Sequence, residues 1–181
     1  MGRDPMTETT IDLKTFIRDI PDFPKKGILF RDITPLLGAP RAMQEVERRF
    51  VEAWKSQNLN AVAGVESRGF IFGTLVARGL QIPFIPIRKQ GKLPWTRLSE
   101  SYALEYGEGV LEAHDDAARA GDRVVIVDDL LATGGTAAAS ARLIERLGAH
   151  VVGFGFVVEL GFLEGRKRLG NTPVVSLITY E

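Results

Sequence analysis

Apolar side chains along this chain follow two alternating patterns, one with helical spacing and one of short continuous runs. Helical spacing predicts a helix capped by Thr10, a second that begins at Pro40, and two more over 68–79 and 136–147. The last helix should stop at Gly148, because glycine commonly follows a helix end. In the helix over 68–79, the side chains expected to face inward are Phe70, Ile71, Leu75 and Val76.

The continuous apolar runs predict strands that are covered on both faces, as in a parallel sheet. They span residues 61–65, 82–87, 124–127, 151–158 and 174–179. Residues 101–106 and 109–114, separated by Gly107, predict an antiparallel pair. Strands that alternate with helices indicate an α/β fold, with a mostly parallel twisted sheet flanked by helices. We expect residues 1–181 to form a single domain.

Two internal segments are predicted to lack regular structure. Pro21, Pro24 and Gly27 favour an irregular stretch up to Asp32, and residues 88–100 are expected to form a basic loop. Residues 1–10 are expected to be flexible, and Met6 offers a second start that would make residues 1–5 an added segment.

Composition narrows the classes of function. Lys plus Arg and Asp plus Glu both number 23, so the net charge is zero, which disfavours binding of nucleic acid through overall charge. Cysteine is absent, which excludes disulfides, thiolate zinc sites and a cysteine nucleophile, and fits a cytoplasmic enzyme. No apolar run approaches the roughly 20 residues that span a bilayer, so we expect no membrane partner.

The most informative segment runs from Val124 to Thr136 and reads VVIVDDLLATGGT. A buried strand is predicted to end in Asp128 and Asp129, followed by a turn and a helix, and ligands of α/β sheets bind beyond such strand ends. The glycines and threonines of the turn offer backbone N–H groups and hydroxyls to an anion at the helix N-terminus.

Carboxylates beside an anion site suit a ligand that also carries hydroxyls or a hydrated Mg²⁺. The segment therefore predicts a sugar with a phosphate at one end and hydroxyls in the middle. The plainer interpretation is that the two acids cap the turn and that the glycines only shape it.

This segment resembles the phosphoribosyl-pyrophosphate (PRPP) motif of type I phosphoribosyltransferases. Further blocks resemble the adenine-specific members of that family in order and spacing: Phe23 to Ile33, Glu66 to Phe70, Arg88 to Pro94 and Ser101 to Gly107. The resemblance covers about residues 11–181. It implies the family's fold, with a small hood and a flexible lid loop over about residues 95–110.

The activity that this resemblance implies is transfer of the 5-phosphoribosyl group of PRPP to adenine, giving AMP and pyrophosphate in purine salvage. Mg²⁺ is the implied cofactor, held mainly by PRPP and water near Asp128 and Asp129. The family also implies a cytoplasmic homodimer.

The resemblance further implies a role for each matched residue. The catalytic residues are Glu105, as the acid/base for a purine proton, and Arg68. PRPP and AMP are held by Asp128, Asp129, Ala132, Thr133, Gly134, Gly135 and Thr136. Pyrophosphate is held by Ser67, Arg68, Arg88, Lys89 and Lys92. Adenine is held by Leu29, Phe30, Arg31 and Leu160.

Plainer interpretations stand beside these roles. Arg68 is then a surface residue at an ordinary turn, the basic loop is a solvated face, Glu105 is an outward acid, and Phe30 belongs to the core. Two rival functions also remain: transfer to another base (hypoxanthine, xanthine or orotate), and a PRPP-binding regulator that also binds nucleic acid. The zero net charge and the presence of Glu105 count against the regulator.

Overall fold

The computed structural model describes residues 11–103 and 108–181, and the chain divides into two compact units, Met1–Glu45 and Val46–Glu181. The helices are η1 (Leu13–Phe16), α1 (Thr34–Leu37), α2 (Pro40–Trp54), α3 (Arg68–Leu80), α4 (Gly135–Arg146), η2 (Gly161–Leu163) and η3 (Gly165–Leu169), where η marks a 3₁₀ helix. Residues 1–10, which are expected to be flexible, lie outside the described residues. So do residues 104–107, the centre of the expected lid. The expectation of a single domain stays a prediction.

The N-terminal unit contains an antiparallel pair of strands, β1 (Arg18–Pro21) and β2 (Leu29–Asp32), where an irregular stretch was expected. Pro21 is the last residue of β1, and Gly27 adopts a φ of 87° in the connection. The proline and glycine signals therefore mark the turn correctly. The residues on either side pair with each other, which local composition does not reveal.

The first predicted helix is shorter than expected and has a different cap. It is the four-residue helix η1, and Asp12 caps it by accepting a hydrogen bond from the Lys14 N–H at 3.0 Å. Ile17 follows it in extended conformation, and Thr10 lies outside the described residues. With few residues, such a helix depends on its cap and on tertiary packing.

Asp32 should make the protein sensitive to acid. Two hydrogen bonds from Thr34 and an ion pair with Arg18 lower the pKa of Asp32 from 3.8 to about 2. A lowered pKa stabilises the folded state above pH 3.8, and this stabilisation is lost as the pH falls towards 2. The melting temperature of Asp32→Ala should therefore lie below that of the wild type at pH 6. The two should converge between about pH 4 and 2, and a gap independent of pH would contradict this linkage.

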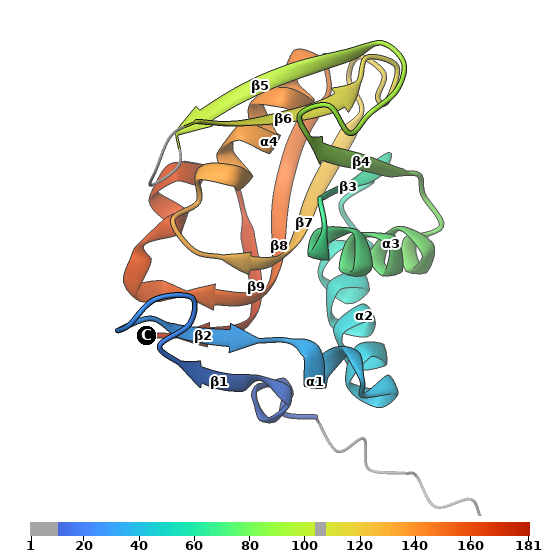
Figure 1. The fold of residues 1–181 in the computed structure, drawn as a ribbon. Coiled ribbons are helices and arrows are strands. Elements are labelled where there is room, and N and C mark those ends of the chain that lie inside the picture. The colour runs from blue at the N-terminus through green and yellow to red at the C-terminus, as the bar shows by residue number, and fades with distance from the viewer. Residues whose placement is uncertain (1–10, 104–107) are drawn as a thin grey trace, which may run out of the picture. The chain divides into compact units, whose positions relative to one another are not determined.

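The C-terminal unit is built on a seven-stranded sheet in the order β5-β6-β4-β3-β7-β8-β9. The strands are β3 (Ala61–Val65), β4 (Phe84–Lys89), β5 (Arg97–Ala103), β6 (Glu108–His114), β7 (Arg123–Leu131), β8 (His150–Leu160) and β9 (Val174–Tyr180). Along the sheet, the neighbouring strands β4, β3, β7, β8 and β9 are parallel to one another. β6 is antiparallel to both of its neighbours, β4 and β5. The prediction of a mostly parallel sheet with an antiparallel excursion is confirmed (Figure 1).

The antiparallel hairpin begins earlier than expected, because residues 97–100 belong to β5 rather than to a loop. Glu100 accounts for this. Its carboxylate receives hydrogen bonds from Arg142 at 2.6 Å and from Arg146 at 3.1 Å, both on α4. These contacts fix β5 against a helix that lies about 40 residues away in the sequence.

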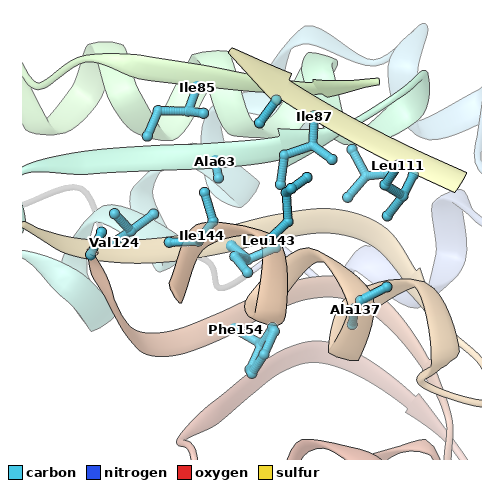
Figure 2. Close-up of a cluster of buried hydrophobic side chains, with 14 of the residues drawn as sticks. Ala63, Ile85, Ile87, Leu111, Val124, Ala137, Leu143, Ile144 and Phe154 are labelled. Atoms are coloured by element: carbon cyan, nitrogen blue, oxygen red, sulfur yellow. The ribbon is translucent and has the colours of Figure 1, made fainter. Parts of the chain in front are cut away.

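The main core lies between the sheet and α4. Figure 2 shows Ala63, Ile85, Leu111 and Val124 of the sheet turned towards Leu143 and Ile144 of the helix. Because side chains alternate along a strand, the neighbouring positions of β3 and β4 face the opposite side, where α3 packs. None of the helices in the described ranges is long and apolar enough to cross a membrane.

The predicted inward face of α3 is only partly right. Val76 is buried as expected, but Ile71 is 37% exposed and Phe72 is buried in its place. A Cβ on Gly64 of β3 would lie 2.8 Å from the Gly69 carbonyl oxygen, so the helix approaches the strand through glycines. This close approach sets the rotation of the helix, and apolar spacing alone does not determine it.

Candidate active site

A cavity of about 360 Å³ opens at the carboxyl ends of β3 and β7. Its lining residues are Val65, Glu66, Ser67, Arg68, Lys89, Tyr102, Leu111, Asp128, Asp129, Leu130, Leu131, Ala132, Thr133, Gly134, Gly135, Thr136, Ala137 and Phe156. The cavity thus brings together every residue predicted to hold PRPP and AMP, with Ser67, Arg68 and Lys89 of the pyrophosphate set. Arg88 and Lys92 are not among its lining residues.

The two adjacent acids lie within β7, and the prediction that the strand ends at them is wrong. Beyond them the strand continues to pair with β8, as far as Leu131 opposite Glu159. Asp128 Oδ1 accepts a hydrogen bond from the Asp129 N–H at 2.9 Å. A Cβ on Gly69 would lie 2.8 Å from the same oxygen, so glycine leaves room for the carboxylate beside the first turn of α3.

Asp128 is poised to gain a partner. Burial and the neighbouring charge of Asp129 raise its pKa well above the ordinary value of 3.8. Holding a negative charge there costs free energy when the cavity is empty of ligand. A hydroxyl donor, or water bound to a cation, would offset that cost by hydrogen bonding to the carboxylate.

The turn after β3 joins the acids through an ion pair. Arg68 Nε lies 2.5 Å from Asp129 Oδ2, and the peptide bond between Glu66 and Ser67 is cis. Ser67 is the N-cap residue of α3, but its side chain makes no capping hydrogen bond. This leaves the hydroxyl and the first N–H groups of the helix available to an anion.

Glu66 holds the basic segment in place. It lies 3.2 Å from Arg88 Nε and accepts a hydrogen bond from the Lys89 N–H at 3.1 Å. Burial raises the pKa of Glu66, but these hydrogen bonds outweigh it and the pKa is lowered overall. Arg88 also donates to the Lys92 carbonyl at 2.8 Å, so its guanidinium serves the loop, while Lys89 lines the cavity.

The loop of residues 132–136 is supported by a segment that sequence reasoning missed. Gly134, at a φ of 79°, lies so close to η3 that a Cβ would come within 2.3 Å of the Gly165 carbonyl oxygen. A Cβ on Gly165 would come within 2.2 Å of the Ala132 carbonyl oxygen. In the sequence, Gly165 is the only sign of this contact. The reason for a glycine there is a loop about 30 residues earlier in the chain.

Substitution of Gly165 should therefore displace the 132–136 loop and lower activity. In Gly165→Ala the new methyl group must displace the 132–136 loop, and a misplacement of about 1 Å can lower a rate about 10²-fold. We expect kcat/KM for PRPP to fall by about that factor. Gly38→Ala is the control, since its Cβ would meet only ordinary contacts at 3.7 Å. Equal activity in the two variants would show that the close approach does not matter.

The described residues contain no cluster of three or more acidic or histidine side chains able to hold a metal ion. The two carboxylates in the cavity instead fit a hydrated Mg²⁺ that a substrate carries, because its water molecules can donate to Asp128 and Asp129.

The predicted adenine residues lie on two elements, one in each unit. Leu29, Phe30 and Arg31 belong to β2, where Arg31 pairs with Asp19 and Phe30 meets Phe23 edge-on at 5.1 Å. Leu160 ends β8 and is partly buried. Their contact with adenine stays a prediction. Glu105 lies outside the described residues, beyond the last pair of the hairpin, Ala103 opposite Glu108.

Comparison with known proteins agrees with this geometry. Residues 34–175 match the phosphoribosyl transferase domain family. The chain is 56% identical over 164 residues to adenine phosphoribosyltransferase from Anaeromyxobacter dehalogenans, covering 91% of this chain and 95% of that protein.

Two crystal structures extend the likeness to the fold. Adenine phosphoribosyltransferase from Thermoanaerobacter pseudethanolicus has a TM-score of 0.90 at 50% identity, covering 93% of this chain and 98% of that one. The enzyme from Saccharomyces cerevisiae, complexed with an imino-altritol bisphosphate and adenine, has a TM-score of 0.86 at 41% identity, covering 91% and 96%. On this likeness in sequence and in fold, the chain belongs to the phosphoribosyltransferase family and, within it, to the adenine phosphoribosyltransferases.

Proposed function

We propose that this chain transfers the 5-phosphoribosyl group of PRPP to adenine, releasing AMP and pyrophosphate, as a step of purine salvage. The observation that carries the proposal is a cavity that joins the two acids of β7, the 132–136 loop and the turn at Ser67–Arg68. A sugar with a phosphate at one end and a pyrophosphate at the other would meet a suitable group at each of these points.

The reaction is a displacement at the anomeric carbon of the ribose. The bond from that carbon to the pyrophosphate oxygen breaks, the bond to adenine N9 forms, and the N9 proton leaves to a base. Positive charge develops on the sugar in the transition state, as in glycoside cleavage. The protein therefore has to hold the ribose in one pose, neutralise the departing pyrophosphate and exclude water.

Each part of the cavity has a role in that task. Asp128 and Asp129 accept hydrogen bonds from the ribose hydroxyls or from water on Mg²⁺, and the 132–136 loop holds the 5′-phosphate. Arg68 and Lys89 face the pyrophosphate, with Ser67 and the N-terminus of α3. Mg²⁺, when bound, neutralises charge on the pyrophosphate. Leu29, Phe30, Arg31 and Leu160 are proposed to hold adenine.

Glu105 is the proposed group for the purine proton. Glu105→Gln keeps the shape of the side chain and removes the base, so turnover should fall at least about 10²-fold while the affinity for AMP changes little. Steady-state rates together with calorimetric AMP binding measure the two effects separately. An unchanged kcat would make Glu105 a surface acid.

The direct test of the function is AMP formation from adenine, PRPP and Mg²⁺, followed by chromatography of the product. Parallel reactions with hypoxanthine, xanthine and orotate distinguish the proposal from a phosphoribosyltransferase of another base. Absence of product with every base, together with retained PRPP binding, would favour a regulator instead.

We propose further that the protein is a cytoplasmic homodimer that works as one domain with a lid over about residues 95–110. Light scattering in solution reports the oligomeric state. Hydrogen exchange with and without PRPP reports the lid, because a closing segment becomes more protected when ligand is bound, including where β5 and β6 already pair with each other.

A further inference from the structure

Three consecutive basic residues lie on η3, and they differ in their partners. Arg166 forms a bidentate ion pair with Glu159, in which each of the two contacts measures 2.6 Å. Lys167 pairs with Glu164 at 2.6 Å. Arg168, in contrast, has no hydrogen bond or ion pair to any residue within 11–103 or 108–181. Because Arg168 is exposed and water can solvate it, a reason to assign it a ligand has to come from its position.

The position of Arg168 supplies one. A Cβ built on Gly135 would lie 3.4 Å from Arg168 Nη1, so the guanidinium lies against the first residue of α4. Gly135 lines the main cavity, and Arg168 lies beside it rather than in the lining. Arg168 also lines a neighbouring cavity of about 270 Å³, which gives the side chain room to change its direction.

The attachment of η3 makes this placement specific. Gly165, three residues before Arg168, is in close contact with Ala132 and Gly134 of the loop. The same short helix that supports the loop from behind therefore delivers a cation to its edge. The loop itself, Ala-Thr-Gly-Gly-Thr, contains no basic residue.

The charges of Arg168 and of the N-terminus of α4 indicate which kind of ligand would bind between them. The N-terminus of a helix carries a partial positive charge, so the Arg168 guanidinium beside Gly135, which no residue of the described ranges neutralises, adds a like charge there. An anion between the two would turn this repulsion into attraction on both sides. A phosphate group fits best, because guanidinium donates two parallel hydrogen bonds to phosphate oxygens while the loop supplies backbone N–H groups.

We propose that Arg168 is a side-chain ligand of the substrate's 5′-phosphate and sets the preference for a phosphorylated ribose. This inference rests on the proposed function, since it needs the 5′-phosphate to lie in the 132–136 loop. It adds to the motif a residue from a different part of the chain, which binds through charge where the loop binds through its backbone.

The test compares Arg168→Ala and Arg168→Lys with Lys167→Ala, a control that removes an exposed cation from the same helix. Calorimetry measures the dissociation constants of AMP and ribose 5-phosphate, and kinetics measures KM for PRPP and for adenine. Arg168→Ala should weaken both phosphate ligands and raise KM for PRPP about 10- to 100-fold, with KM for adenine unchanged. Arg168→Lys should recover part of the loss, and Lys167→Ala should show none.

The outcomes separate this inference from the function on which it rests. If the wild type makes AMP and Arg168→Ala binds ribose 5-phosphate as tightly as the control does, the role of Arg168 is overturned and the function stands. The role is overturned as well if Arg168→Ala raises KM for adenine as much as KM for PRPP, because the loss is then not specific to phosphate. If the wild type neither makes AMP nor binds PRPP, the proposed function fails, and this inference fails with it.

Discussion

Replacing Asp128 and Asp129 together by asparagine should lower kcat/KM for PRPP about 10⁴-fold. Each carboxylate is proposed to accept a charged hydrogen bond from a ribose hydroxyl or from metal-bound water, and the loss of such a bond costs up to about 3 kcal/mol. Two losses of that size amount to about 6 kcal/mol, and each 1.4 kcal/mol is about a tenfold change in rate. Asparagine keeps the shape of both side chains, so the effect reports the charge.

The fold should survive this change. Because burial and Asp129 raise the pKa of Asp128, the native state binds that proton more tightly than the unfolded chain does. Stability then falls as the pH rises above the ordinary value of 3.8, so at pH 7 this carboxyl group makes the folded protein less stable. Asp128→Asn alone should therefore raise the melting temperature at pH 7, and this gain should vanish below about pH 4.

Steady-state kinetics and thermal unfolding measure the two effects on the same samples. Asp116→Asn is the matched control, since it removes an exposed carboxylate in the turn after β6. Near-normal use of PRPP by the double variant would refute the ribose role of the two acids. A lower melting temperature for Asp128→Asn would show that the carboxylate is already satisfied in the free protein.

Adenine should be preferred over hypoxanthine by about 10⁴-fold in kcat/KM. Adenine offers a donor at its C6 amino group and an acceptor at N1, and hypoxanthine reverses both. Main-chain groups of Leu29 and Arg31, the proposed readers, can match only one of these patterns. The wrong base leaves buried polar groups unpaired, at about 1–3 kcal/mol each.

Because the readers are backbone atoms, side-chain substitution should change activity but not the choice of base. Arg31→Ala removes the ion pair with Asp19 across β1 and β2, so β2 is held less firmly and activity falls with both bases. Arg18→Ala removes the neighbouring ion pair with Asp32 across the same two strands, so it should lower activity with both bases in the same way. Comparable kcat/KM for the two bases in the wild type would overturn the selection of adenine by this protein and leave its use of PRPP intact.

Much of this fold could be predicted from local pattern. The run Val124–Val127 is buried throughout, α2 begins at Pro40, and α4 is followed by Gly148 at a φ of 87°. These features depend on side chains that are neighbours in the sequence, such as a continuous apolar run, a fixed proline φ or a glycine beyond a helix end. The motif around Asp128 was identifiable for the same reason, since its acids and its loop are adjacent in the chain.

The tertiary structure decided whatever depends on a distant partner. β7 continues past the two acids because β8 pairs with Leu131, and β5 is longer because Arg142 and Arg146 hold Glu100. The rotation of α3 follows from the glycine contact between α3 and β3.

Partners also decided which predicted cations face the cavity. Glu66 engages Arg88 and leaves Lys89 at the cavity. Arg168, which the sequence analysis did not single out, lies beside Gly135 without a carboxylate partner among the described residues. A charged residue in a sequence shows only that it needs a partner. Whether that partner is another residue or a ligand depends on which segments the folded chain brings within hydrogen-bonding distance, and local spacing carries no record of that.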